Sequence, residues 1–87
     1  GVASYSLLVK ASAAKELGAT PKKDRERLAA RIKGLGTTPR PAGSEKLSGE
    51  EKYRIRQGDY RILYLIEDAS STVTIIKIGH RREVYRN

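Results

Sequence analysis

Apolar and polar residues largely alternate over residues 53–66, with one interruption at Gly58 and Asp59. A period of two predicts two strands, and glycine followed by a polar residue suits a two-residue type II′ turn between them. In this register Arg56 lies opposite Arg61. The hairpin then has one apolar face and one face rich in guanidinium groups. A register shifted by one residue would mix charged and apolar side chains, so the two-residue turn is favoured.

A strand and a short helix are expected near the start of the chain. Residues 5–10 are rich in strand formers and mostly apolar, which predicts a buried or half-buried first strand. Ser12 can cap a short helix over residues 13–17 through its side-chain oxygen. Gly18 then suits a left-handed stop, because glycine enters that conformation without steric penalty.

A second helix is expected directly afterwards. Thr20 as N-cap and Pro21 at the first helical position predict its start. Three apolar residues recur at helical spacing: Leu28, Ile32 and Leu35. Gly34 and Gly36 mark its end. Four basic residues form the outer face: Lys22, Lys23, Arg27 and Arg31. Such a face is more often solvated surface than a binding site, and the two helices predict a helical hairpin packed on a sheet.

A long loop and a last strand complete the pattern. Residues 36–51 contain prolines and glycines with almost no periodicity, so we expect a loop that Leu47 anchors in the core. Residues 72–78 are β-branched and almost continuously apolar, which predicts a strand inside the sheet. The order predicts an α+β fold, β-α-α-β-β-β, with the helical hairpin packed on a small, mostly antiparallel four-stranded sheet. We expect a single domain over residues 1–87.

Composition restricts the chemistry that the chain can support. Its 87 residues include no cysteine and one histidine, which excludes disulfides, cysteine-ligated metals and histidine clusters within one chain. No cofactor is expected. No segment is apolar enough to span a membrane and no signal-peptide pattern is present, so a cytoplasmic location is expected. The net charge of +8 predicts an anionic partner: nucleic acid, an acidic protein or, as the weaker alternative, a membrane surface.

Two groups of polar residues are candidates for function. Like charges directly opposite one another in a sheet are destabilising, so Arg56 facing Arg61 makes sense if an anion such as phosphate lies between them. The second group is the C-terminal segment. Residues 79–86 leave the apolar pattern and present one imidazole, three guanidinium groups and a phenol.

Three stretches give the chain a family resemblance. They are Lys-Leu-Ser-Gly at 46–49, the hairpin Tyr-Arg-Ile-Arg-Gln-Gly-Asp-Tyr-Arg-Ile-Leu-Tyr at 53–64, and Ile-Gly-His-Arg-Arg-Glu-Val-Tyr at 78–85. In this order and spacing they resemble the RelE/ParE superfamily of bacterial toxins, and RelE-like mRNA interferases in particular, over nearly the whole chain. The resemblance implies a microbial ribonuclease that enters the ribosomal A site, where the mRNA is attacked by its own 2′-hydroxyl.

The resemblance also implies which residues act. The family positions on the second and third strands fall on Arg54, Arg56 and Arg61. Those after the last strand fall on Arg81 and Tyr85. The implied roles are phosphate clamping for Arg56 and Arg61, assistance to the transition state or leaving group for Arg81, and base stacking or orientation for Tyr85. Metal-free cleavage of RNA needs a deprotonated 2′-hydroxyl, a stabilised pentavalent phosphate, a protonated leaving oxygen, and bases held so that the attack is in line.

The general base is where this chain departs from the family. Well-known members carry lysines at the positions of Arg54 and Arg56, one of them proposed as the base, and arginine is a poor proton acceptor. His80 is the obvious substitute, because histidine titrates near neutrality and His80 precedes Arg81. The alternative is that His80 merely ends a strand in solvent. Three other tyrosines are assigned mainly to packing: Tyr53, Tyr60 and Tyr64.

Two other functions stay open. A ParE-like toxin would share the fold and poison DNA gyrase without cleaving RNA, but that branch generally lacks the set of Arg61, Arg81 and Tyr85. A non-catalytic basic module would bind nucleic acid or a ribosomal surface, as the change from lysine to arginine allows. The expected partners are the ribosome with its mRNA and an acidic antitoxin protein, RelB-like or other, in a hetero-oligomer. No membrane partner is expected.

Overall fold

Seven elements follow one another in the computed structural model, which describes residues 4–47 and 51–80. They are β1 (Ser6–Val9), α1 (Ala11–Gly18), α2 (Lys22–Leu35), β2 (Glu45–Lys46), β3 (Lys52–Gln57), β4 (Tyr60–Glu67) and β5 (Thr72–His80). Within these residues, neither helix has the length and apolar character needed to cross a membrane.

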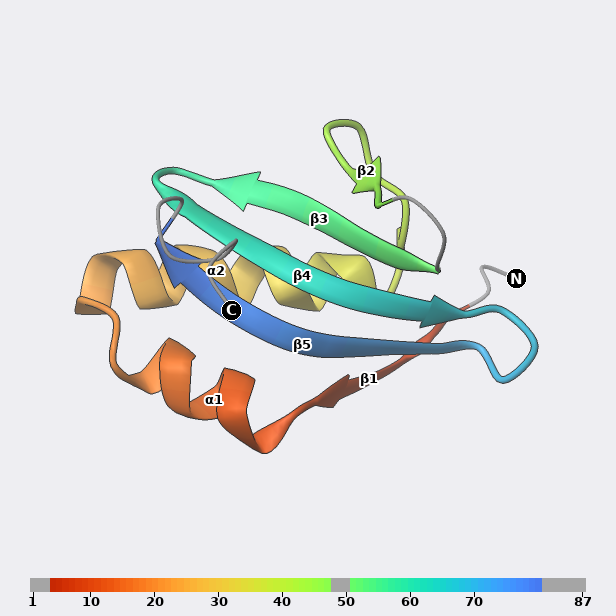
Figure 1. Cartoon of the computed structure of the whole chain (residues 1–87), viewed down its shortest axis with the longest axis horizontal. Helices are drawn as coiled ribbons and strands as arrows, with labels where there is room; N and C mark the ends of the chain where they lie inside the picture. Colours follow the sequence, from red (N-terminus) through yellow and green to blue (C-terminus); the bar gives the residue numbers. More distant parts are fainter. Residues whose placement is uncertain (1–3, 48–50, 81–87) are drawn as a thin grey trace.

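The strands form one five-stranded sheet in the order β1-β5-β4-β3-β2. β1 runs parallel to β5, and every other neighbouring pair is antiparallel. In Figure 1, α2 crosses behind the sheet and α1 lies beside the edge formed by β5 and β1. The α+β class and the mostly antiparallel sheet are confirmed. The predicted count of four strands is wrong, because the two-residue β2 is too short to leave a periodic pattern in the loop.

The hairpin of β3 and β4 has the predicted register, with Arg56 opposite Arg61. Gly58 has a φ of 61°, and Ser71 is the only non-glycine residue with positive φ in the part of the chain that the structure describes. Asp59 therefore has a negative φ. Positive φ at the first turn position alone is what a type II′ turn requires, so the predicted turn is confirmed.

The core lies between α2 and the sheet face that α2 covers. Its buried side chains come from both helices and three strands: Ala13, Leu28, Ile32, Leu35, Tyr53, Ile55, Ile62, Tyr64, Ile66, Val73, Ile75 and Ile78. A fully buried large apolar side chain contributes about 1.5–3 kcal/mol. Tyr53 and Tyr64 stack with ring centroids 5.8 Å apart, and Tyr60 packs against the same cluster. The packing role predicted for these three tyrosines is confirmed.

A β-bulge bends β5 where α1 approaches it. Leu63 pairs with Lys77 and Tyr64 pairs with Ile75, which leaves the residue between the two partners as the extra one. Glu16 of α1 holds this part of the strand. Its carboxylate accepts hydrogen bonds from the backbone N–H of Ile78 at 3.0 Å and from Nζ of Lys77 at 3.4 Å. The carboxylate thus satisfies a backbone donor at the edge of β5 beyond the end of β1.

The predicted boundaries of α1 are wrong at both ends. The backbone N–H of Lys10 still bonds to the carbonyl of Ile75, and the helix begins at the next residue, so Ser12 lies inside α1 and caps nothing. Gly18 is helical, and Ala19 caps α1 in the right-handed conformation. The N–H of Ala19 is satisfied by carbonyls of the last turn, so no left-handed residue is needed.

The predicted start of α2 is wrong by one residue, because Pro21 is the N-cap and Thr20 is not. The hydroxyl of Thr20 donates instead to the carbonyl of Leu17 at 2.7 Å, at the end of α1. Of the basic outer face, Lys22, Lys23 and Arg27 are exposed, which fits the solvated surface that we expect. Arg31 departs from this: it is half-buried, and its Nε is buried without a partner among the described residues.

β1 is more exposed than its apolar sequence predicts. Leu8 is 55% exposed and Val9 is 44% exposed, the largest exposures of big apolar side chains in the described residues. The reason is position. β1 pairs only with β5 and forms the outer strand of the sheet, and α1 follows it directly without folding back over its outer face. Tyr5 and Leu7 pack against the core from the other side, so the first strand is half-buried, as one of the two predicted alternatives has it, and is not fully buried.

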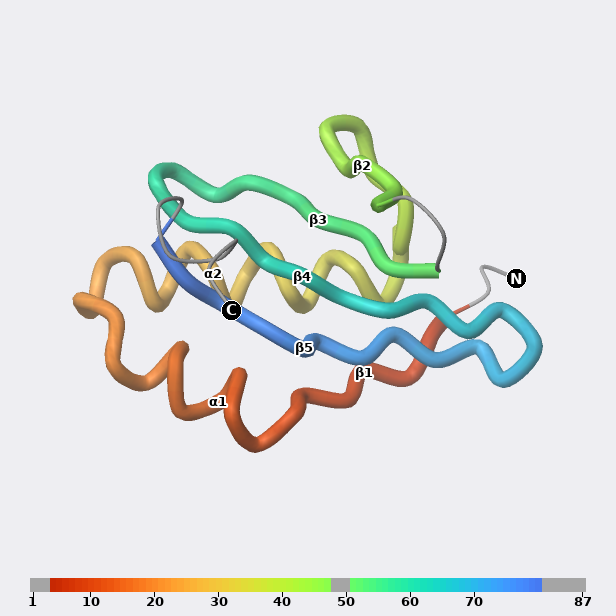
Figure 2. The backbone as a smooth tube through the Cα atoms, in the orientation of Figure 1, coloured from red at the N-terminus to blue at the C-terminus, as the bar shows by residue number. Residues whose placement is uncertain are grey.

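The loop between α2 and β3 is fixed by polar contacts and not by Leu47, which is half-exposed and lies outside the core cluster. Figure 2 shows this loop rising beside the sheet to place β2 next to β3. The hydroxyl of Tyr64 donates to the carbonyl of Pro39 at 2.8 Å. The prediction that Leu47 anchors the loop is wrong, because hydrogen bonds to a buried tyrosine and to the next turn replace an apolar anchor.

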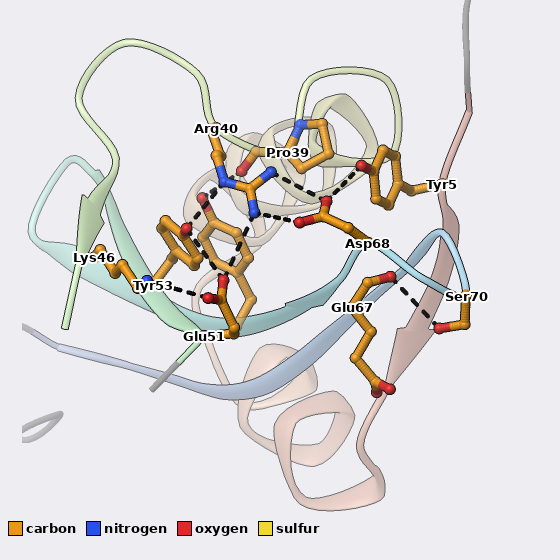
Figure 3. Close-up of polar contacts among 10 residues, drawn as sticks. Tyr5, Pro39, Arg40, Lys46, Glu51, Tyr53, Glu67, Asp68 and Ser70 are labelled. Carbon is orange, nitrogen blue, oxygen red and sulfur yellow. Dashed lines mark hydrogen bonds and ion pairs between the residues drawn. The ribbon is translucent and has the colours of Figure 1, made fainter. Parts of the chain in front are cut away.

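Arg40 makes the second attachment of this loop (Figure 3). Its guanidinium forms a bidentate pair with Asp68 in the turn between β4 and β5, at 2.8 Å and 3.2 Å, and its Nε donates to the hydroxyl of Tyr53 at 2.9 Å. Asp68 also accepts a 2.7 Å hydrogen bond from Tyr5. The hydrogen bonds from Arg40 and Tyr5 hold the pKa of the Asp68 carboxyl below its usual range.

Candidate functional site

Three predicted site residues share one face of the sheet. Ile55 and Ile62 point into the core, and side chains alternate along a strand, so the residues beside them point away from α2. Arg54, Arg56 and Arg61 lie on this outer side. We call it the arginine face. The structure therefore brings together the three guanidinium groups that the hairpin pattern predicts on one side.

Arg56 and Arg61 form the centre of the arginine face. They are direct partners across β3 and β4; Arg56 is exposed, whereas Arg61 is only 9% exposed. The Nε of Arg61 is buried and has no hydrogen-bond partner among the described residues. Gly79 lies opposite Arg61 on β5, so no side chain competes for the sheet surface there. An unpaired buried donor and a like-charged neighbour both destabilise the fold, and an anion with several oxygens would relieve both.

Arg54 lies two residues from Arg56 on β3 and has a carboxylate beside it. Glu45 of β2 is its direct cross-strand partner, and an oxygen of Glu45 forms an ion pair with Nη2 of Arg54. Sequence reasoning missed Glu45 because it missed β2. The only signal was the proximity in sequence of an acidic residue to a basic hairpin, which is too common to predict a contact.

His80 lies on the other side of the sheet. It pairs with Tyr60, whereas Arg61 pairs with Gly79, so His80 points toward the α2 side and Arg61 away from it. The rings of His80 and Tyr60 meet edge to face, with centroids 5.8 Å apart. The structure does not bring His80 onto the arginine face, although both lie at the end of the sheet where β5 finishes.

A cleft of about 420 Å³ opens beside His80. It lies between the end of β5 and the connection from α1 to α2. Its lining residues are Glu16, Ala19, Thr20, Tyr60, Lys77, Ile78, Gly79 and His80. His80 therefore lines a partly apolar cleft, and it does not simply end a strand in open solvent.

Two further candidates, Arg81 and Tyr85, lie outside the described residues. Within the described ranges, no group of three or more histidine or acidic side chains is arranged to hold a metal ion. The chemistry available on the arginine face is therefore charge stabilisation by guanidinium groups, which bind phosphate well and accept protons poorly.

Comparisons with known proteins agree with this fold. The sequence model of the ParE toxin of type II toxin–antitoxin systems matches residues 7–85. Toxin RelG of Mycobacterium tuberculosis is 44% identical over 34 residues, a match that spans 39% of this chain and 39% of that toxin.

Two solved structures extend the likeness over the whole fold. The archaeal RelE in the RelE–RelB complex of Pyrococcus horikoshii has a TM-score of 0.82 and 26% identity, covering 93% of this chain and 99% of that one. The isolated RelE toxin of Escherichia coli has a TM-score of 0.77 and 30% identity, covering 93% of this chain and 90% of that one. The chain therefore belongs to the ParE toxin family of type II toxin–antitoxin systems, within the RelE/ParE superfamily.

Proposed function

We propose that this toxin is a ribosome-dependent endoribonuclease that cleaves mRNA in the A site and so inhibits translation. The observation that carries the proposal is Arg61, buried to 9% exposure opposite Arg56, with its Nε unpaired among the described residues. A fold tolerates such an arrangement at a site where a ligand completes it. A phosphate supplies both the charge and the acceptors that the pair lacks.

The arginine face supports the second of the four chemical requirements of RNA cleavage, which is stabilisation of the pentavalent phosphate. As the 2′-hydroxyl attacks, negative charge accumulates on the equatorial oxygens of the phosphate. Arg56 and Arg61 are fixed donors on rigid strands, so they stabilise that charge without reorganising. Removing one such donor typically costs about 10²–10³ in rate. Arg54 lies on β3 with Arg56; it would hold a neighbouring phosphate and keep the RNA extended along β3.

The other three requirements are assigned to residues near the end of β5 and beyond it. We propose that Arg81 assists the transition state or the leaving 5′-oxygen, and that Tyr85 stacks on a base to hold the attack in line. His80 is proposed as general base, and its place on the α2 side requires the 2′-hydroxyl to reach it around the end of β5. Water or Tyr85 would take the proton if that path is not used.

The partners follow from the family and the charge. RelE-like toxins have been solved in complex with RelB antitoxins, and the net charge here is +8. We propose an acidic antitoxin, encoded beside the toxin, that forms a hetero-oligomer with it in the cytoplasm. Carboxylates of that antitoxin can occupy the arginine face in place of phosphates.

Cleavage of a translated message tests the proposal against its alternatives. Purified toxin is added to a translation reaction, and the 5′ ends of the message fragments are mapped. Cuts in the A site that disappear in Arg61→Ala support the ribonuclease. An intact message together with inhibited DNA gyrase would replace it with the gyrase poison that the matching ParE family suggests. An intact message with tight ribosome binding would identify a non-catalytic module.

A further inference from the structure

Glu45 places a carboxylate on the arginine face. It is the cross-strand partner of Arg54, and residues directly opposite in a sheet project to the same side. The carboxylate pairs with Nη2 of Arg54, and the two side chains are 63% and 29% exposed. The contact is therefore at the surface, where an incoming ligand can reach it.

β2, which carries Glu45, is fixed in position by the rest of the fold. Lys46 pairs with Tyr53, and the N–H of Leu47 bonds to the carbonyl of Lys52 at 2.8 Å. The loop before β2 is held by the bidentate pair of Arg40 and Asp68. The backbone pairing of β2 with β3 and the attached loop therefore hold Glu45 beside Arg54. The contact does not rely on the flexible side chains alone.

A carboxylate and a phosphate use the same donors of a guanidinium group. We propose that Glu45 is a built-in competitor for RNA phosphate at Arg54: it occupies this guanidinium in the free toxin and is displaced when the RNA backbone binds. The inference rests on the proposed function, because it assumes that RNA lies on the arginine face. It assigns Glu45 the role of lowering RNA affinity.

The size of the effect follows from the exposure of the pair. Exposed ion pairs are worth little, so displacing Glu45 should weaken RNA binding by only about two- to fivefold. Glu45→Gln keeps the size of the side chain and removes its charge. We expect the variant to bind RNA about two- to fivefold more tightly.

The test uses a single-stranded RNA with 2′-O-methyl groups, which cannot be cleaved by its own 2′-hydroxyl. Its affinity for wild type and Glu45→Gln is measured by fluorescence anisotropy across a range of salt concentrations. Glu26→Gln is the matched control, because it makes the same change in net charge on the exposed surface of α2. A gain in Glu45→Gln that Glu26→Gln lacks separates a local contact from general electrostatics.

A double mutant identifies the partner. In the Arg54→Gln background, Glu45→Gln should have no further effect, because the guanidinium for which Glu45 competes is gone. In message cleavage, Glu45→Gln should lower KM and leave kcat unchanged, because the substitution strengthens binding of the ground state and of the transition state equally.

Three results would overturn the inference: equal RNA affinity in Glu45→Gln and Glu26→Gln, weaker binding in Glu45→Gln, or no RNA binding by wild type. Weaker binding would make Glu45 a residue that positions Arg54. The proposed function fails separately. If wild type cuts no message but Glu45→Gln binds RNA more tightly, the proposed ribonuclease function is wrong and the competitor role of Glu45 is supported. If wild type cuts the message but Glu45→Gln does not change RNA binding, the ribonuclease function is supported and the competitor role is wrong.

Discussion

Arg61→Leu is expected to stabilise the protein while it removes the proposed activity. Arg61 is 9% exposed, faces Arg56, and has a buried Nε without a partner among the described residues. An unsatisfied buried donor costs about 1–3 kcal/mol, and a like charge directly opposite costs some tenths more. Leucine keeps part of the aliphatic bulk that the arginine stem supplies. The net gain should be about 1 kcal/mol, which raises Tm by about 4–8 °C in a domain of this size.

The same substitution should lower message cleavage by at least about tenfold, since it removes a fixed donor to the developing charge. Stability is measured by thermal unfolding followed by circular dichroism at pH 7, and cleavage by primer extension on a translated message. Arg56→Leu is the matched control. Arg56 is exposed, so its removal relieves only the repulsion, and stability should change by no more than about 0.5 kcal/mol.

A Tm several degrees below wild type in Arg61→Leu would refute the argument from the unpaired donor, because it would mean that Arg61 holds the fold together. Cleavage at the wild-type rate in a folded Arg61→Leu would remove Arg61 from the mechanism. Measuring stability and cleavage together thus separates a structural role of Arg61 from a functional one, which a loss of activity alone would not distinguish.

Four shorter predictions accompany it. Arg81→Ala should lower message cleavage by at least about tenfold with an unchanged unfolding midpoint, and near-wild-type cleavage would remove Arg81 from the mechanism. If His80 is the base, message cleavage should be lost in His80→Ala while ribosome binding persists; a variant that cleaves at the wild-type rate would exclude it. Hydrogen bonds from Arg40 depress the pKa of Asp68 in the folded state, so the folded chain binds this proton less tightly than the unfolded chain. Asp68→Asn should therefore lower the urea midpoint at pH 7. The difference should shrink once pH falls below the unfolded-state pKa of about 4 and vanish below the lower folded-state pKa; a difference as large at pH 3 as at pH 7 would contradict this linkage. Association with the acidic antitoxin should slow by about an order of magnitude when salt rises well above physiological, with less change in dissociation, and a salt-independent association rate would contradict electrostatic steering.

The hairpin was predictable to the residue because two local signals agree. The alternation of side chains and the Gly58 turn each define the register, and together they place Arg56 opposite Arg61. The class of the fold was predictable for a similar reason, since α2 carries its apolar residues at helical spacing. The local sequence pattern was enough to predict an element wherever that element's own residues determine its geometry.

Features that depend on distant parts of the chain were not predictable. Whether an apolar strand is an edge is decided by its neighbours, so the sequence did not reveal that Leu8 would be exposed. Glu45 reaches Arg54 only because the loop returns along β3. The side of the sheet on which His80 lies depends on its pairing with Tyr60, and residues 79–86 have no alternation that would reveal that pairing. These three features depend on the order and pairing of the strands, which the short-range periodicity of the sequence does not reveal.

The parallel pairing of β1 with β5 has a consequence for how the toxin is made. It joins the first and the last strand of the described residues, and Tyr5 bonds to Asp68 across 63 positions. A hairpin such as that of β3 and β4 closes in about 1–10 μs once both strands exist, but long-range pairing must wait for loop closure. During synthesis at about 5–20 residues per second, β1 emerges seconds before its partner. The nascent toxin therefore cannot complete its sheet until β5 has been synthesised and has left the ribosome, so no folded toxin exists while its own ribosome is still translating the segment from β1 to β5.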